Sequence, residues 1–142
     1  MFYYLNGTLV HTDPNTAVID CGGVGYRLTI SGSTLGHLAG KLNTEVKLFT
    51  YLAVREDGME LYGFSDLKEK TAFEMLIGVS GVGPKAAVAI LTLLSPDRLS
   101  AAILSEDQKA ISRAVGVGPK TAARVILELK DKVSKQIGRA HD

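Results

Sequence analysis

The sequence predicts an α+β protein with a β-rich half followed by a helical half. Up to about residue 64, short apolar runs are separated by turn residues such as Asp13-Pro14-Asn15 and Asp57-Gly58, which is typical of strands. After that point, helix start signals recur along the chain. Residues 1–64 carry four Lys or Arg against six Asp or Glu, whereas residues 65–142 carry twelve against nine. These changes predict two domains, residues 1–64 and residues 65–142.

The first domain is predicted to be a five-stranded OB-type β-barrel. Its expected strands are Phe2–Val10, Thr16–Asp20, Val24–Ile30, Glu45–Val54 and Met59–Phe64. Gly22, Gly23 and Gly25 are expected to make a turn or bulge, and a short helix over Ser33–Ala39 separates the third and fourth strands. This order favours an OB-type barrel, a common nucleic-acid platform. A barrel with no ligand is the alternative, because fold alone does not decide function.

The second domain is predicted to contain five helices, at about 66–77, 84–94, 96–103, 106–114 and 119–136. Ser65 can cap the first of them. Ser95 is followed by Pro96 at the first helical position, and Ser105 with Gln108 forms a capping-box pattern. The first and second helices flank one turn, and the fourth and fifth flank another.

One thirteen-residue unit occurs twice in this domain. Residues 79–91 read VSGVGPKAAVAIL, and thirty-five residues later residues 114–126 read AVGVGPKTAARVI. In each copy a left-handed glycine can end one helix, a second glycine allows close approach of a partner, and the proline suits the first turn of the next helix. Free amides, the positive end of the helix dipole and a lysine then face one point, as in a phosphate site.

This pattern resembles the helix-hairpin-helix motif, which grips the DNA backbone without reading bases. A single copy could be a purely structural hairpin, but two copies with lysine at the same offset favour DNA binding. The predicted backbone contacts are Gly81, Val82, Gly83 and Lys85 in the first copy, and Gly116, Val117, Gly118, Lys120 and Arg124 in the second. Arg124 lies four residues after Lys120 on the same helix face, and an ordinary solvated arginine is its alternative interpretation.

Other phosphate-binding and catalytic motifs fail on spacing. The two hairpin sequences do not fit the P-loop pattern, because Pro84 and Pro119 stand at the position where a P-loop requires lysine. No ATPase site is therefore expected. The glycines near Tyr26 lack the third glycine of a dinucleotide fingerprint. The histidines are scattered, so no catalytic set, metal site or cofactor is expected. A DNA glycosylase with Lys85 or Lys120 as nucleophile is the enzyme alternative, but it needs a catalytic aspartate and a base pocket between two helical domains.

A single-strand binder that uses the barrel is the second alternative. It would need exposed aromatic residues among basic ones. The barrel is net acidic, and core packing explains most of its aromatic residues, which are Phe2, Tyr3, Tyr4, Tyr26, Phe49, Tyr51, Tyr62 and Phe64.

Composition predicts a soluble, cytoplasmic protein. The chain has 142 residues, of which 46% are hydrophobic, and a single cysteine. No run of about 18 apolar residues suggests a membrane span, and the N-terminus lacks the positive region of a secretory signal. One cysteine leaves no disulfide and no cysteine-based metal centre.

The whole chain resembles the first two domains of the RuvA family of bacterial Holliday junction-binding proteins. The resemblance rests on residues 22–26 (GGVGY), residues 54–64 (VREDGMELYGF) and the two GVGPK hairpins in this order. The family adds a flexible linker and a third helical domain that engages the RuvB motor. Nothing after about Ile137 supplies that domain, so the resemblance implies a truncated chain.

The resemblance also implies a mechanism and partners. Four copies would form a square homotetramer, or two tetramers an octamer, and each arm of a four-way junction would be held at two hairpins. Glu56 and Asp57 would meet at the junction centre and repel phosphates, holding the junction open, although an exposed hairpin tip is their bland interpretation. Glu60 adds to this field or faces solvent. The implied partners are junction DNA, RuvB and the RuvC resolvase, in recombination and the SOS response to DNA damage.

Overall fold

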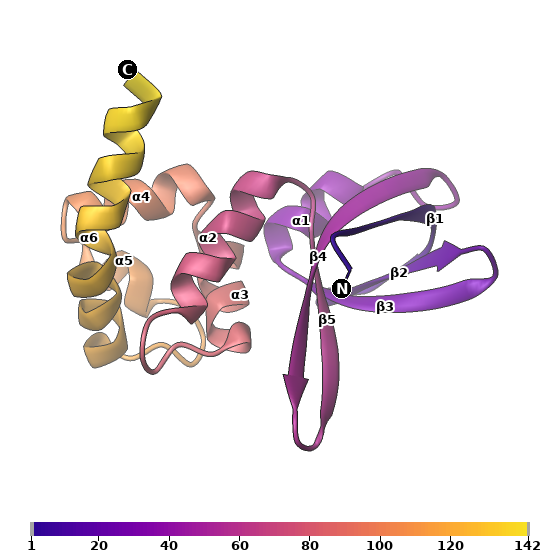
Figure 1. Ribbon diagram of the computed structural model, residues 1–142, viewed down its shortest axis with the longest axis horizontal. Coiled ribbons are helices and arrows are strands. Elements are labelled where there is room, and N and C mark those ends of the chain that lie inside the picture. The colour runs from indigo at the N-terminus through magenta and orange to yellow at the C-terminus, as the bar shows by residue number, and fades with distance from the viewer. Residues whose placement is uncertain (1, 142) are drawn as a thin grey trace. The chain divides into compact units, whose positions relative to one another are not determined.

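The computed structural model describes residues 2–141, with side chains up to Gln136 (Figure 1). The strands are β1 Tyr4–Thr12, β2 Thr16–Cys21, β3 Val24–Ile30, β4 Glu45–Arg55 and β5 Gly58–Phe64. The helices are α1 Gly32–Leu38, α2 Leu67–Ile77, α3 Pro84–Leu93, α4 Pro96–Leu104, α5 Gln108–Ser112 and α6 Pro119–His141. The predicted fold class is confirmed, and the predicted elements are present, most with small shifts at their ends. The helix expected over 106–114 is shorter, Gln108–Ser112, and the helix expected over 119–136 is longer, Pro119–His141.

The first strand shows the largest shift in the barrel. It was expected over Phe2–Val10 and lies two residues later. Phe2 and Tyr3, which precede the observed strand, still bond to β4. The Thr50 amide donates to the Tyr3 carbonyl at 2.9 Å, and the Thr50 hydroxyl donates to the Phe2 carbonyl at 3.0 Å.

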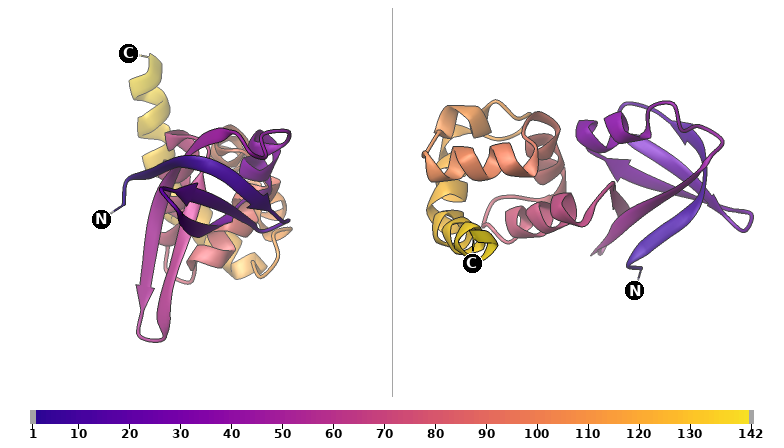
Figure 2. Two further views of the ribbon diagram at one scale, coloured as in Figure 1. Left: turned by 90° about the vertical axis from the view of Figure 1, so that its right-hand side faces the viewer. Right: turned by 90° about the horizontal axis from the view of Figure 1, so that it is seen from above.

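The β-strands close into a barrel in the order β1-β2-β3-β5-β4 (Figure 2). All pairs are antiparallel except β3 with β5, which pair in parallel through Thr29 with Tyr62 and Ile30 with Gly63. Alternate residues face inward and form the core, with fully buried side chains at Leu9, Ile19, Leu28, Leu48 and Phe64. The expected turn is confirmed at Gly22 and Gly23, because Cys21 pairs with Val24 across these two residues. Gly25 is not part of it and lies within β3, where it pairs with Asp20.

The β4–β5 hairpin extends well beyond the barrel (Figures 1 and 2). Its strands remain paired out to Arg55 and Gly58, so Glu56 and Asp57 form the tip. Near the tip, Val54 and Met59 face each other and are 64% and 73% exposed. The end of the hairpin is therefore held by backbone pairing and not by a hydrophobic core.

The aromatic residues of β1 correct one expectation. Core packing was expected to explain most barrel aromatics, but Phe2, Tyr3 and Tyr4 are 45%, 56% and 47% exposed. Strand alternation explains Tyr4, since Leu5 points inward and Tyr4 therefore points outward, whereas Phe2 and Tyr3 precede the first residue of β1. Tyr3 and Tyr4 pack edge to face against each other, and both pack against Phe49.

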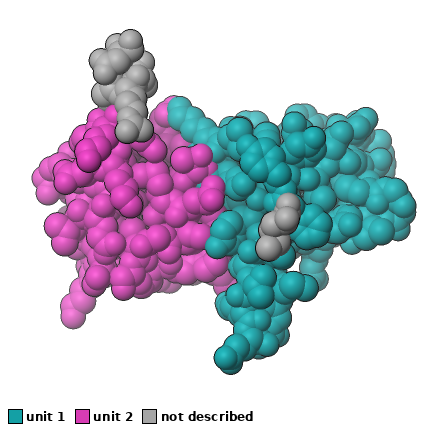
Figure 3. Space-filling model, in the orientation of Figure 1, with its two compact units in different colours: residues 1–70 teal, residues 71–142 magenta. Residues whose placement is uncertain are grey.

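The residues group into two compact units, Met1–Lys70 and Thr71–Asp142 (Figure 3). The first turn of α2 belongs to the barrel unit. There Glu69 is 2% exposed and accepts hydrogen bonds from Ser31 Oγ at 2.9 Å and Thr34 Oγ1 at 2.5 Å. The domain limits 1–64 and 65–142 stay a prediction.

Two predicted helix caps are wrong. Asp66, and not Ser65, caps α2, because its Oδ1 accepts the Glu69 amide at 2.8 Å. Asp107, and not Ser105, caps α5 by accepting the Ala110 amide at 3.2 Å. Carboxylates near a helix N-terminus also gain from the dipole. The Ser95 cap of α4 is confirmed by its bond to the Arg98 amide.

The helical unit has a core that follows the sequence repeat. Six positions offset by thirty-five residues are buried in both copies, and they pair Leu76 with Ile111, Val79 with Ala114, Val82 with Val117, Ala87 with Ala122, Ile90 with Val125 and Leu91 with Ile126. The duplication therefore extends from sequence to packing.

Among the described residues no single helix is long and apolar enough to cross a membrane, and α3 with α4 reaches the required length and composition only as a pair bent by 94°.

Candidate nucleic-acid interface

The first hairpin joins α2 to α3 through a tight, hydrogen-bonded turn. The Val79 amide donates to the Leu76 carbonyl at 3.0 Å, and the Val82 amide donates to the Val79 carbonyl at 3.0 Å. Gly81 has a φ of +91°, a conformation that favours glycine. The first helical hydrogen bond of α3 then runs from the Ala87 amide to the Gly83 carbonyl at 3.0 Å.

The second hairpin, between α5 and α6, repeats these contacts. The amides of Ala114 and Val117 donate to the carbonyls of Ile111 and Ala114 at 3.2 and 3.1 Å. Gly116 has a φ of +80°, and the Ala122 amide donates to Gly118 at 3.0 Å. Figure 1 shows both turns at the lower end of the helical unit. The sequence repeat is therefore a repeat of backbone geometry.

The second glycine of each turn is not required by the fold. Gly83 has φ −90° and ψ 175°, which any residue can adopt. A Cβ built at Gly83 or Gly118 meets nothing within 4 Å. Gly83 also provides no side-chain cap for α3, so the amides of the first turn keep their hydrogen-bonding capacity. A glycine here leaves both space and donors to an external group.

Lys85 and Lys120 follow the two prolines and are exposed. Neither forms an ion pair with another residue in the described part of the chain. Each lysine thus lies in the first turn of a helix, where its charge adds to the positive end of the dipole. The structure brings together glycine amides, helix N-terminus and lysine in each copy, as the sequence predicted.

Arg124 differs from the two lysines. Its Nε lies 2.7 Å from Glu128 Oε2, and this pair spans one turn of α6. Exposed pairs of this type contribute only about 0.3–0.5 kcal/mol, so a phosphate could displace the carboxylate. A contact from Arg124 to DNA stays a prediction.

Val82 and Val117 occupy an anchoring position in the hairpins. Both side chains are 5% exposed, and both amides donate within the turn. The valines hold each turn to the helical core and thereby place the glycines on either side. Their amides are already used within the turns, and a direct contact of either valine with DNA stays a prediction.

The acidic tip of the β4–β5 hairpin is Glu56 and Asp57, both exposed. Behind it lies a network that sequence reasoning missed. Glu60 Oε1 accepts from Thr29 Oγ1 at 2.9 Å, and Glu60 Oε2 accepts from Arg55 Nη2 at 3.2 Å and from Tyr62 OH at 3.0 Å.

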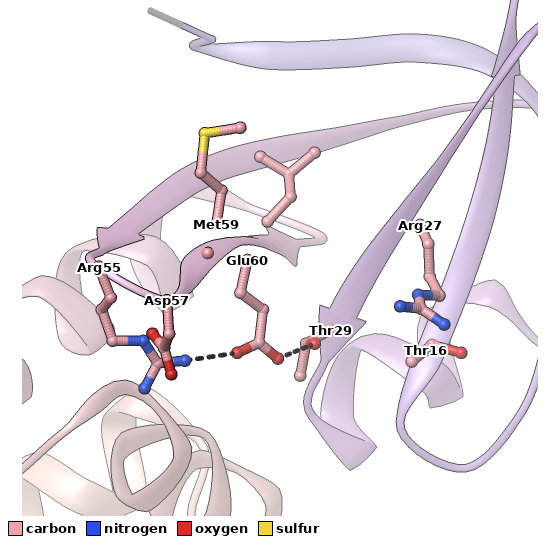
Figure 4. Close-up of a pocket in the computed structure, with 9 residues that line it drawn as sticks. Thr16, Arg27, Thr29, Arg55, Asp57, Met59 and Glu60 are labelled. Carbon is pink, nitrogen blue, oxygen red and sulfur yellow. Dashed lines mark hydrogen bonds and ion pairs between the residues drawn. The ribbon is translucent and has the colours of Figure 1, made fainter.

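Thr29, Arg55 and Glu60 border a hollow of about 370 Å³ between the hairpin and strands β2 and β3 (Figure 4). Burial and then the bond to Glu60 raise the pKa of the Tyr62 hydroxyl well above its ordinary value. Tyr62 therefore remains protonated and donates to Glu60 at neutral pH. No sequence signal marks these contacts, since Thr29 and Glu60 are thirty-one residues apart.

Metal-ligand geometry is not found in the described residues, where no group of three or more His, Cys, Asp or Glu side chains could hold an ion.

Two family models match the chain. The "RuvA N terminal domain" matches residues 1–63, and the "SAM-like Helix-hairpin-helix tandem" matches residues 73–131.

Curated relatives match over nearly the whole chain. A protein of Acetivibrio thermocellus named "Holliday junction branch migration complex subunit RuvA" is 48% identical over 136 residues, which are 96% of this chain and 67% of the relative. The chain belongs to the RuvA family. Relatives with the same name from Ruminiclostridium cellulolyticum and Acidobacterium capsulatum are 46% and 44% identical, and the match covers 68% and 70% of their lengths. The two family models correspond to the two units of the structure: the first model matches the barrel, and the second matches the helical hairpins.

Proposed function

We propose that this chain binds four-way DNA junctions through backbone phosphates and holds them open for branch migration. The observation that carries the proposal is the duplicated hairpin. Two turns of the same hydrogen-bonded geometry each end in a glycine, which has no side chain to cap the following helix, and each is followed by an exposed lysine that forms no ion pair with the described residues. Such sites bind phosphate through amides and dipole without base contacts, as recognition of DNA shape requires.

The acidic tip gives the proposal its structural selectivity. Glu56 and Asp57 are exposed at the end of a hairpin that extends beyond the barrel. At the centre of a junction these carboxylates repel the phosphates of the four strands and disfavour a stacked or duplex ligand. In this proposal the hairpins supply the affinity and the tip discriminates between DNA shapes.

The proposed assembly is a homotetramer, or an octamer of two tetramers around one junction. The relatives are named as subunits of a branch migration complex, and a fourfold arrangement would match the four arms of the ligand. The chain would act as a non-catalytic, cytoplasmic DNA-binding subunit in recombination and repair. ATP-driven movement would come from the RuvB motor, engaged through the family's third domain, with the RuvC resolvase as a further partner.

A gel-shift comparison of four-way junction, linear duplex and single strand tests the proposal. Junction binding should be tightest. Lys85→Ala with Lys120→Ala should weaken it and make the dependence of log K on log salt shallower by about one unit for each lost contact. Lys109→Ala is the matched control, because Lys109 is an exposed lysine of the same unit that follows no hairpin. Unchanged affinity and slope in a folded double variant would remove the lysines from the site.

A second candidate is single-strand binding by the barrel. Exposed Tyr3 and Tyr4 lie beside cations, with Lys70 Nζ 4.7 Å from the Tyr3 ring and Lys47 Nζ 4.1 Å from the Tyr4 ring. Aromatic rings among cations suit base stacking. Single-strand affinity that exceeds junction affinity, and that falls in Tyr3→Ala and Tyr4→Ala, would favour this candidate.

A further inference from the structure

The base of the β4–β5 hairpin is organised around one carboxylate. Glu60 lies on β5, and its side chain is 29% exposed. Its three hydrogen-bond donors come from three strands, because Thr29 lies on β3, Arg55 on β4 and Tyr62 on β5. This cluster lies where the parallel pairing of β3 with β5 begins, at Thr29 and Tyr62. It therefore lies at the point where the hairpin leaves the barrel.

Packing alone does not fix the hairpin at this point. A hollow of about 370 Å³ separates the base of the hairpin from Thr16 and Arg27 on the neighbouring strands (Figure 4). Glu60 and Thr29 are joined beside this space by their hydrogen bond. This side-chain bond joins the hairpin to β3 next to the backbone pairing of Thr29 with Tyr62 and of Ile30 with Gly63. It therefore adds a contact that restrains the base of the hairpin relative to β3.

The second contact of Glu60 controls charge. Arg55 directly precedes Glu56 and Asp57 in the chain, and its side chain is 54% exposed. A free guanidinium at this position would have two other partners available, the tip carboxylates and a DNA phosphate. Its ion pair with Glu60, at 3.2 Å, holds it at the base of the hairpin. The tip then keeps its two uncompensated negative charges.

We infer that Glu60 is the positioning residue of the acidic tip, tying the hairpin to β3 through Thr29 and holding Arg55 so that it neither neutralises Glu56 and Asp57 nor contacts DNA. The inference rests on the proposed role of the tip in junction selectivity. It assigns Glu60 a role distinct from simple addition to the negative field, because Glu60 acts through Arg55.

Glu60→Gln tests the charge contact and leaves the side-chain shape and the acceptor for Thr29. Released Arg55 should become more mobile, measured without DNA by NMR relaxation of its side-chain Nε, because the variant removes the ion pair that holds the guanidinium. With DNA, it should add a phosphate contact, so that the salt slope of duplex binding steepens by about one unit. The junction-to-duplex affinity ratio should fall at low salt.

Arg55→Gln with Glu60→Gln should return the duplex slope and the junction-to-duplex ratio toward those of Arg55→Gln alone. Glu45→Gln is the matched control, since Glu45 is an exposed barrel glutamate that accepts a hydrogen bond from Asn6. It removes the same charge away from the hairpin and should leave both quantities unchanged. Thr29→Val should accelerate amide hydrogen exchange at residues 56–59, because it removes the tie to β3.

Unchanged Arg55 side-chain mobility and an unchanged duplex slope in folded Glu60→Gln would overturn the inference, and so would equal changes in the Glu45→Gln control. A failure of the proposed function can be distinguished from a failure of this inference, because it would appear when the charges of the tip itself are removed. If neutralising Glu56 and Asp57 leaves the junction-to-duplex ratio unchanged, the tip has no selective role, whatever the NMR relaxation of Arg55 in Glu60→Gln gives.

Discussion

Replacing Gly83 and Gly118 with serine should separate DNA binding from folding. The backbone at Gly83, with φ −90° and ψ 175°, accepts a serine without strain, and the added Cβ meets nothing within 4 Å at either site. Serine is a better N-cap than glycine by a few tenths of a kcal/mol. The free energy of unfolding should therefore stay equal or rise slightly in Gly83→Ser and Gly118→Ser.

Binding should respond in the opposite direction. The serine Oγ would accept an amide of the first helical turn and would occupy the space in which a phosphate oxygen is proposed to lie. A hydrogen bond to a charged group contributes about 1.5–3 kcal/mol, so each hairpin should lose roughly tenfold to a hundredfold in junction affinity. The two sites lie in separate hairpins, and their effects should be nearly additive.

The assay combines fluorescence anisotropy with a labelled four-way junction and denaturant unfolding of the same samples. Gly81→Ser is the matched control for strain, because Gly81 has a φ of +91° and a side chain there should cost roughly 1–2 kcal/mol of stability. Folded Gly83→Ser with Gly118→Ser that binds junctions as tightly as the parent would refute the proposal that these turns hold phosphates.

Two further predictions concern carboxylates. Changing Glu56 and Asp57 to glutamine and asparagine should leave folding intact and raise duplex affinity more than junction affinity, an asymmetry that should shrink with added salt; a constant ratio at low salt would contradict it. Burial raises the pKa of Glu69 above its ordinary value of 4.5, against the opposing bonds from Thr34 and Ser31, so the protonated form is favoured in the folded state. The free energy of unfolding should thus fall as pH rises from the pKa of Glu69 in the unfolded chain to its pKa in the folded protein. Denaturant titrations at several pH values measure this slope. Glu69→Gln should remove it, and Glu74→Gln, at an exposed position of the same helix, should retain it.

The capping errors show how far local sequence rules reach. Ser65 and Ser105 have the residue type of an N-cap, yet Asp66 and Asp107 cap the helices one and two residues later. Serine and aspartate are similarly good caps, so propensity alone could not choose between neighbours. The choice follows from where each chain segment enters its helix. Gln108 illustrates this, since its side chain donates to the Pro119 carbonyl and not to a capping box.

The exposure of Tyr4 on β1 has a comparable cause. Tyr4 belongs to an apolar run that fits a buried strand, and composition does not distinguish the inner face from the outer one. The register of β1 against β4 decides it, because Leu5 pairs with Leu48 on the inside of the barrel. A shift by one residue would exchange the two faces.

The sequence by itself determined the order of elements and the two hairpins, because a Gly-Val-Gly-Pro-Lys turn depends on contacts within a few residues, such as Val82 to Val79 and Ala87 to Gly83. Only the tertiary structure decided the partners of Glu60 and Glu69. Glu60 meets Thr29 across thirty-one residues and Glu69 meets Ser31 across thirty-eight. Such contacts form when the barrel closes β3 against β5 and brings the start of α2 onto α1. The spacing of these residues along the chain does not predict them.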